Sequence, residues 1–307
     1  MAIKADKIWM DGELIDFEKA QVHILTHSLH YGLGAFEGIR CYKRGDGRSA
    51  IFRLREHARR LVESCHIATM PLTWSVDDVM KACVDTVKAN NFEDCYIRPL
   101  AFLGDGEMGL AAMSNKVRLA VIAWPWGSYL GDEGIQNGID ARISSFSRHH
   151  INAAMAKGKI TGQYVNSILA KREAMADGYQ EAIMLDSSGF VSEGTGENIF
   201  AVYDNVIYTT PFHEAILGGI TRDTIITLAK ERGYKVVESR MTRDFLYVCQ
   251  EVFVVGTAAE VTPIRSIDHR QIGTGKPGEI SKAMQAAYFD LVKGDATNHD
   301  EWFEFIS

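Results

Sequence analysis

Two lysines, Lys157 and Lys159, lie among small residues in the stretch MAKGKITGQY at 155–164. Lysine is seldom buried unless it is paired or has a chemical task. An unprotonated amine in such a place can attack a carbonyl carbon, which is one route to covalent catalysis. Most lysines are surface residues, but the small neighbours Gly158 and Gly162 leave room here for a ligand to approach. The residues alone leave open which lysine, if either, does this chemistry.

Three other stretches in the second half of the chain could serve the same reaction. SEGTGEN at 192–198 carries Glu193 and Glu197 after a strand-like run, and either acid could act, or both could be solvated. LGGIT at 217–221 sets glycines before a helix, where N–H groups and the dipole favour an anion, although glycine there is common. VVGTAAE at 254–260 ends an apolar run, which alone indicates a plain strand end. Together with a lysine, these stretches supply the amine, carboxylate and anion site that a pyridoxal phosphate enzyme needs.

The bulk composition is that of an ordinary globular protein. The chain has 307 residues, 46% apolar and 24% charged, which favours two domains and little disorder. A net charge of −7 argues against a broad grip on nucleic acid or on an anionic membrane. Its five scattered cysteines show no metal or redox spacing, and no signal peptide or membrane-spanning run is visible. We therefore expect a cytoplasmic protein with reduced thiols.

Periodicity predicts the secondary elements. Asp11 and Gly12 indicate a two-residue hairpin, and Ser75 is expected to cap a helix. Helices are predicted at about 55–70, 75–91, 165–176, 220–232 and from about 242, and strands at 95–103, 117–126, 234–239, 251–259 and in a meander over 181–210. The glycine-rich and aromatic stretch that follows the strand at 117–126 is typical of a connector. The predicted division is a small N-terminal domain at 1–123, an interdomain loop at 124–134 and a larger domain at 135–307.

The motifs together resemble the class IV aminotransferases, the fold-type IV pyridoxal phosphate enzymes, and most closely the branched-chain amino acid aminotransferases. The resemblance extends from HYGLGAFEGIRCY through YIRPL, KITGQY, FVSEGTGENIF and LGGITRDTI to VVGTAAEVTPIRS. It implies an α+β fold with a small α/β sandwich domain and a larger pseudo-barrel domain. The implied reaction transfers the amino group of L-leucine, L-isoleucine or L-valine to 2-oxoglutarate in two half-reactions.

The same resemblance assigns the cofactor site. The family pattern has lysine five residues before tyrosine, which makes Lys159 the residue that binds the cofactor covalently and leaves Lys157 as a bystander. Glu193 is expected at the pyridine nitrogen and Tyr164 at the ring oxygen. Arg60, rather than its neighbour Arg59, matches the phosphate arginine. The remaining cofactor residues are Leu217, Gly219, Ile220, Thr221, Gly256 and Thr257.

Substrate contacts follow partly from a strand pattern. Tyr96 and Arg98 are two residues apart on a predicted strand, so their side chains share a face. The resemblance assigns Tyr96 to the α-carboxylate and Arg98 to the γ-carboxylate of glutamate. The other implied substrate residues are Tyr31, Phe36, Gly38, Leu110, Trp126, Tyr129 and Ala258. Because Tyr31 and the Leu110 loop reach in from a neighbouring subunit in the family, we expect at least a homodimer.

Alternatives and departures qualify this interpretation. After EMGL the chain reads AAMSN where relatives carry an Asn-Pro pair, and Ile151 and Met155 replace two prolines, which leaves fine substrate preference open. A D-amino acid or (R)-amine transaminase, or an aminodeoxychorismate lyase, is the rival within the family. Outside it, the rivals are an aldolase-like Schiff-base enzyme and an inactive binding module. His23, His27 and His30 lack a further ligand at a recognisable spacing, so we expect no metal site.

Overall fold

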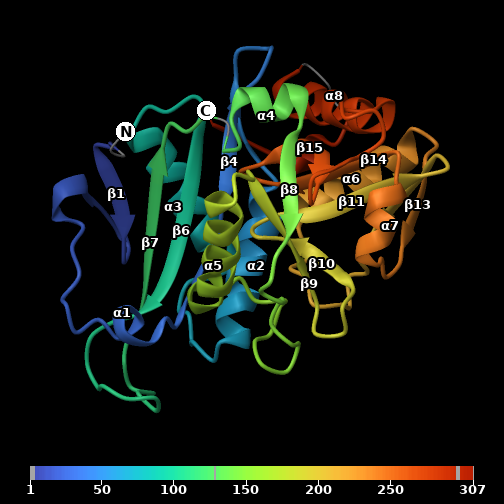
Figure 1. Ribbon diagram of the computed structural model, residues 1–307. Helices are drawn as coiled ribbons and strands as arrows, with labels where there is room; N and C mark the ends of the chain where they lie inside the picture. The colour runs from blue at the N-terminus through green and yellow to red at the C-terminus, as the bar shows by residue number, and fades with distance from the viewer. Residues whose placement is uncertain (1–3, 128, 295–297, 307) are drawn as a thin grey trace. The chain divides into compact units, whose positions relative to one another are not determined.

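Two compact units, each built on one β-sheet, make up the chain in the computed structural model, which describes residues 4–127, 129–294 and 298–306 (Figure 1). Unit 1 contains Met1–Trp126, Gly158–Gln163 and Val292–Ser307. Unit 2 contains Gly127–Lys157 and Tyr164–Leu291. Helices and sheets in both units confirm the predicted α+β class. The domain limits at 1–123, 124–134 and 135–307 stay a prediction, and Ser128 of that loop lies outside the described residues.

The sheet of unit 1 is antiparallel throughout. Its strand order is β17-β5-β4-β6-β7-β1-β2, with β3 paired to β6. The bounds are β1 Lys7–Met10, β2 Glu13–Asp16, β3 Gly34–Phe36, β4 Ile39–Lys43, β5 Ser49–Phe52, β6 Cys95–Leu103, β7 Val117–Trp124 and β17 Phe303–Ile306. Asp11 and Gly12 join β1 to β2 with φ values of 52° and 108°, as the hairpin prediction requires.

Two amphipathic helices, α2 Leu54–Ile67 and α3 Val76–Ala89, pack on one face of this sheet (Figure 1). Leu61 and Cys65 of α2, and Val79 and Cys83 of α3, are buried against the strands. Burial of such a side chain stabilises the fold by roughly 1.5–3 kcal/mol. Ser75 caps α3 with a full capping box to Asp78, as predicted. The short elements are α1 His27–Tyr31 and the 3-10 turns Phe17–Lys19, Thr161–Gln163 and Asp300–Trp302.

The sheet of unit 2 is mixed. Its strand order is β10-β9-β8-β15-β14-β11-β12-β13, and β16 pairs with β15. The β8–β9, β8–β15 and β12–β13 pairs are parallel, and the others are antiparallel. The bounds are β8 Ile139–Ile143, β9 Glu181–Leu185, β10 Val191–Gly194, β11 Asn198–Tyr203, β12 Val206–Thr209, β13 Lys235–Glu238, β14 Glu251–Gly256, β15 Glu260–Ile267 and β16 Arg270–Gln271.

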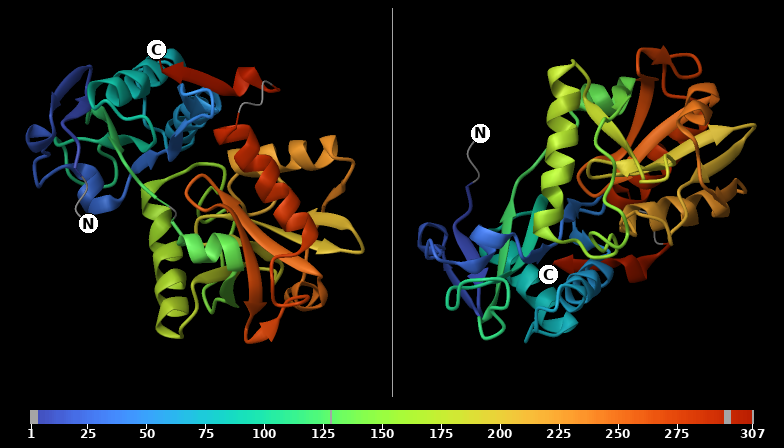
Figure 2. Two further views of the ribbon diagram at one scale, coloured as in Figure 1. Left: turned by 90° about the horizontal axis from the view of Figure 1, so that it is seen from above. Right: turned by 60° about the horizontal axis from the view of Figure 1, so that its bottom comes forward.

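Helices of unit 2 pack on this sheet from several sides. α5 (Tyr164–Ala176) lies along β9, α6 (Ile220–Glu231) against β13 and β14, and α4 (Asp132–Asn137) against β15 (Figure 2). The remaining helices are α7 Arg243–Val248 and α8 Glu279–Lys293, whose last two residues belong to unit 1. In the described ranges, no helix combines the length and apolar character needed to cross a bilayer.

Candidate active site

Lys159 is held through its backbone in unit 1. Its N–H donates to Ser64 Oγ of α2 at 3.0 Å, and its carbonyl accepts from the N–H of Phe36 in β3 at 3.1 Å. Its Nζ lies 4.9 Å from the centroid of the Phe36 ring. These two hydrogen bonds fix the main chain on both sides of the lysine side chain.

Lys157 has a different environment, inside unit 2. Its Nζ donates to the carbonyls of Phe212, Glu214 and Ile216, with N–O distances of 2.9 Å for the last two. Burial lowers the pKa of Lys157, against the opposing charge of Glu193. This ammonium group therefore ties together the loop that precedes α6.

Arg60, which lies in α2, forms a bidentate ion pair with Glu37. Its Nε and Nη2 lie 2.7 and 2.8 Å from Oε1 and Oε2 of Glu37, which is fully buried. His57 donates from Nδ1 to Oε2 of the same carboxylate at 2.7 Å. Burial alone would raise the pKa of Glu37, but the charge and hydrogen bonds of Arg60, supported by the hydrogen bond from His57, outweigh it and hold that pKa well below its usual range. The adjacent Arg59 is exposed.

The predicted substrate residues of unit 1 gather around Arg98. Its Nη2 donates to the Tyr96 hydroxyl at 3.1 Å, as expected for neighbours on one strand face. Its guanidinium lies 4.7 Å from the Phe36 ring centroid, and Trp126 packs edge-on against Tyr96 at 4.6 Å. A Cβ at Gly38 would lie 1.9 Å from the Tyr96 hydroxyl, so a side chain there would displace it. The cluster combines one cation with aromatic walls.

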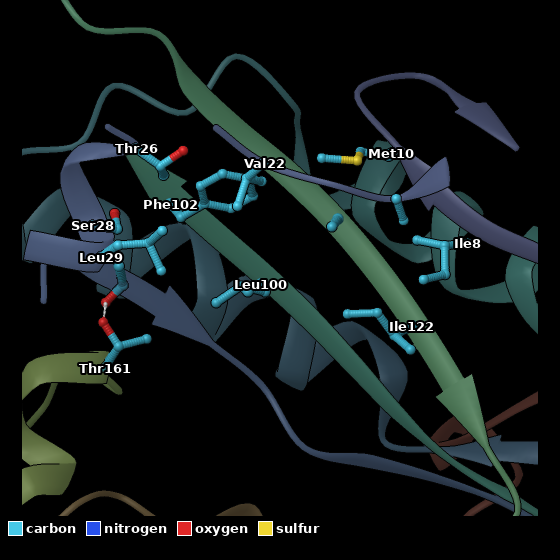
Figure 3. Close-up of a pocket in the computed structure, with 13 residues that line it drawn as sticks. Ile8, Met10, Val22, Thr26, Ser28, Leu29, Leu100, Phe102, Ile122 and Thr161 are labelled. Carbon is cyan, nitrogen blue, oxygen red and sulfur yellow. Dashed lines mark hydrogen bonds between the residues drawn. The ribbon is translucent and has the colours of Figure 1, made fainter. Parts of the chain in front are cut away.

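Two predicted substrate residues of unit 1 lie outside this cluster. Leu110 is 91% exposed in the loop before β7, and Tyr31 is 45% exposed at the end of α1. Near α1 the structure has an open apolar pocket of 330 Å³ on the sheet of unit 1. Figure 3 shows Leu100, Phe102 and Ile122 lining it. Thr161, which also lines the pocket, donates from its hydroxyl to the Gly34 carbonyl.

Glu193 lies buried on β10 in unit 2. Its Oε2 accepts from Asn198 Nδ2 and from the Leu217 N–H, both at 3.1 Å, and its Oε1 lies 2.9 Å from Arg148 Nε. The two N–H donors and the nearby guanidinium thus surround the buried carboxyl group of Glu193 with favourable partners. Sequence reasoning missed Arg148, because no spacing links a loop arginine to β10. Asn198 stands in the family signature, which was a usable signal.

The LGGIT segment forms the start of α6. Gly219 is the N-cap in an extended conformation, and no side chain caps the helix. A Cβ at Gly219 would lie 1.9 Å from Asn198 Oδ1, so only glycine fits there. The first N–H groups of a helix have no carbonyl partner within it. Ile220 and Thr221, both largely buried, thus stand where an anion is favoured.

The remaining predicted residues of unit 2 are partly exposed. Tyr164 is the partly buried first residue of α5, and Tyr129 is 40% exposed with its ring 5.5 Å from Lys171 Nζ. The end of β14 places Gly256, Thr257 and Ala258 partly exposed. Glu197 is not among the predicted site residues. Its burial, and to a smaller extent the charge of Glu181, raise its pKa to about 8.

No group of three or more potential metal ligands occurs among the described side chains. His27 and His30 instead donate from Nε2 to the carbonyls of Gly109 and Ile24, each at 2.8 Å.

Comparison with known proteins identifies the family. The model of amino-transferase class IV matches residues 34–267. The branched-chain-amino-acid aminotransferase of Pseudomonas aeruginosa is 51% identical over 302 residues, covering 98% of each chain. The crystal structure of the Escherichia coli branched-chain amino acid aminotransferase matches with a TM-score of 0.95 and 45% identity, over 99% of this chain and 100% of that one. The Thermobaculum terrenum enzyme, crystallised in its PLP-form, matches with a TM-score of 0.91 and 34% identity over 100% of both chains. These matches confirm the fold-type IV prediction, and the chain belongs to the class IV aminotransferase family.

Proposed function

We propose that this transaminase transfers the amino group of L-leucine, L-isoleucine or L-valine to 2-oxoglutarate. The observation that carries the proposal is the cluster of Arg98, Tyr96, Phe36 and Trp126, which pairs one cation with aromatic walls. Such a surface can receive either an apolar branched side chain or the second carboxylate of glutamate. Relatives named for branched-chain substrates, with 51% and 45% identity over nearly the full chain, support this substrate class.

The chain's residues fit pyridoxal 5'-phosphate, the cofactor of class IV aminotransferases. A buried carboxylate such as Glu193, already held by Asn198 and Leu217, suits a protonated pyridine nitrogen. The uncapped N-terminus of α6 suits a phosphate group. When bound, the cofactor withdraws electrons from the bonds at the substrate's α-carbon.

We propose the following roles for the cofactor residues. Lys159 would hold the cofactor covalently through its Nζ, and in the reaction its amine would carry the proton at the substrate's α-carbon. Glu193 keeps the ring nitrogen protonated, and Tyr164 hydrogen-bonds the ring oxygen. Arg60, the backbone groups at Ile220 and Thr221, and the Thr257 hydroxyl would bind the phosphate. The other residues assigned to the cofactor are Leu217, Gly219 and Gly256.

Substrate orientation is assigned to the remaining residues. Tyr96 and the backbone at Thr257 and Ala258 hold the α-carboxylate, and Arg98 holds the γ-carboxylate of glutamate. Phe36, Gly38, Trp126 and Tyr129 exclude water from the apolar side chain.

We further propose that the working form is a homodimer. Leu110 and Tyr31 are exposed, and an apolar pocket lies on the nearby sheet, so a second copy of this chain would cover apolar surface and supply side chains to its partner's site. Light scattering should give at least twice the chain mass. All five cysteines are free, buried thiols, which supports the cytoplasm as the place of action.

The substrate assignment is tested by half-reactions followed through the yellow absorbance of the loaded enzyme. L-leucine, L-isoleucine, L-valine and L-glutamate should each bleach it, whereas D-amino acids and (R)-amines should not. Faster bleaching by D-amino acids would identify a D-amino acid transaminase instead.

An arginine variant sharpens the substrate test. Arg98→Leu should lower the affinity for L-glutamate by roughly 10- to 100-fold, because a charge-assisted hydrogen bond is lost. The affinity for L-leucine should fall far less. Arg118→Leu is the matched control, because Arg118 pairs with Asp11 in the same unit. It should leave the preference unchanged, and an equal loss for both substrates in Arg98→Leu would contradict the assignment.

A further inference from the structure

A buried carboxylate that is not among the predicted site residues lies behind the phosphate arginine. We propose that Glu37, supported by His57, is a positioning residue that fixes the guanidinium of Arg60 for the cofactor's phosphate. The inference rests on the proposed role of Arg60. Glu37 lies in the motif FEGIR and would orient the arginine that binds the phosphate, without itself touching cofactor or substrate.

The contacts around Glu37 form a closed set. Both oxygens are engaged by Arg60, Oε1 with Nε at 2.7 Å and Oε2 with Nη2 at 2.8 Å. Oε2 also accepts from His57 Nδ1 at 2.7 Å and, more weakly, from the Gly38 N–H at 3.3 Å. The carboxylate is fully buried and His57 is 2% exposed, so water does not compete for these bonds.

Two parallel hydrogen bonds restrict an arginine more than one does. A planar guanidinium held through Nε and Nη2 loses its rotation about the side-chain axis, which fixes the direction of Nη1. The binding of phosphate then requires less ordering of a long, flexible side chain. Glu37 is suited to this because its own backbone N–H donates to the Pro99 carbonyl at 2.9 Å, in a strand region of unit 1.

His57 completes the arrangement without adding charge. Burial lowers the pKa of His57, against the opposing effect of Glu37, which favours a neutral ring. The set then contains one negative and one positive side chain, so Arg60 offers directed N–H groups with its charge already compensated. Loss of Glu37 would remove two charge-assisted hydrogen bonds from the largely buried guanidinium of Arg60, which would then reorient.

The rival explanation is that Glu37 merely joins β3 to α2 and stabilises unit 1. The two explanations differ in what they predict for the phosphate group. A positioning role affects ligands that carry phosphate, whereas a general structural role weakens every ligand of the site alike.

The test compares the affinity of the apoprotein for pyridoxal 5'-phosphate and for pyridoxal. Glu37→Gln should lower the affinity for pyridoxal 5'-phosphate by about tenfold or more, and the affinity for pyridoxal by less than about threefold. Arg60→Gln should show the same phosphate-specific loss, and the double variant should lose little more than either single variant. Equal losses for both ligands, or additive losses in the double variant, would overturn the proposal.

Matched controls separate folding from positioning. Glu56→Gln removes a different carboxylate, which lies in α2 and pairs with Arg53, and it should leave the ratio of the two affinities unchanged. If Glu37→Gln does not fold, His57→Asn and His57→Leu replace it. The asparagine amide can still donate to Glu37 and should preserve the ratio, while leucine should lower it. The same ratio in both His57 variants would contradict the proposal.

The wild-type protein distinguishes the failure of this inference from that of the proposed function. If the wild type binds pyridoxal 5'-phosphate no better than pyridoxal, the proposed cofactor site is wrong. If the wild type discriminates and Glu37→Gln discriminates equally well, only the role of Glu37 is refuted.

Discussion

Lys157 and Lys159 are two residues apart, yet they belong to different compact units and have different surroundings. The Lys157 amine donates three hydrogen bonds to backbone carbonyls of unit 2. Lys159 is anchored in unit 1 through its backbone by Ser64 and Phe36, and its Nζ faces an aromatic ring. The difference shows how two nearby lysines can be anchored, Lys157 through hydrogen bonds of its amine and Lys159 through hydrogen bonds of its main chain.

Two buried carboxyl groups, one in each unit, have pKa values shifted in opposite directions. In unit 1, Glu37 meets Arg60 and His57, and its pKa falls despite burial. In unit 2, burial and the charge of Glu181 raise the pKa of Glu197 to about 8, although the charge of Lys171, which pairs with Glu181, opposes this shift. Neighbours therefore decide the protonation of equally buried acids.

The largest expected effect separates the two lysines by activity. Lys159→Ala should lower the rate of transamination by at least about 100- to 10 000-fold, since it removes the group that moves the proton. Lys157→Ala should keep the rate within about tenfold in the same assay. Comparable losses in both variants would remove the distinction between them.

A pH series tests the contrast between the carboxylates. The unfolded chain ionises Glu197 near pH 4.5 and the folded chain only near pH 8, so this residue destabilises the fold increasingly between those values. Glu197→Gln removes that dependence. As pH rises from about 5 to about 8, the free energy of unfolding of this variant should increase relative to that of the wild type by a few kcal/mol, an order-of-magnitude figure of about 1.4 kcal/mol per pH unit. A difference that stays flat across this range in denaturant titrations would refute the raised pKa.

The structural role of Lys157 is tested by stability. Lys157→Met keeps the aliphatic stem but leaves three carbonyls without their donor, and should cost about 1–3 kcal/mol of unfolding free energy. Equilibrium denaturation measures this. Glu214→Gln removes a nearby charge and keeps the Glu214 carbonyl, so it should cost clearly less.

The smallest expected effect concerns the anchor of Lys159. Ser64→Ala removes the acceptor of the Lys159 N–H and should cost about 1 kcal/mol of stability, with a moderate loss of transamination rate. Ser75→Ala removes the cap of α3 in the same unit at a similar cost and should leave the rate unchanged. An unchanged rate in Ser64→Ala would show that the side chain of Lys159 needs no such anchor.

Local signals allowed the prediction of most of the fold, and long-range pairing explains most of what was missed. The capping residue Ser75 and Gly233, which has φ 80° just after α6, mark helix ends within a few residues. The helix α8 was not predicted, although Ile280, Met284, Ala287 and Leu291 have helical spacing and are buried. The strand β17 was not predicted because its four residues become a strand only through pairing with β5.

The candidate site was predictable where it lies within motifs. Lys159, Glu193 and the LGGIT segment stand in contiguous patterns, so a resemblance could locate them. Arg148 beside Glu193 and Ser64 beside Lys159 come from segments distant in sequence, and no local pattern announces a contact made by folding.

The most direct test of the account is to locate the covalent bond to the cofactor. The enzyme loaded with pyridoxal 5'-phosphate is reduced with borohydride, digested and mapped by mass spectrometry. The account predicts one phosphopyridoxyl group, on Lys159, and an unmodified Lys157. A group on Lys157, or on any other lysine, would contradict it.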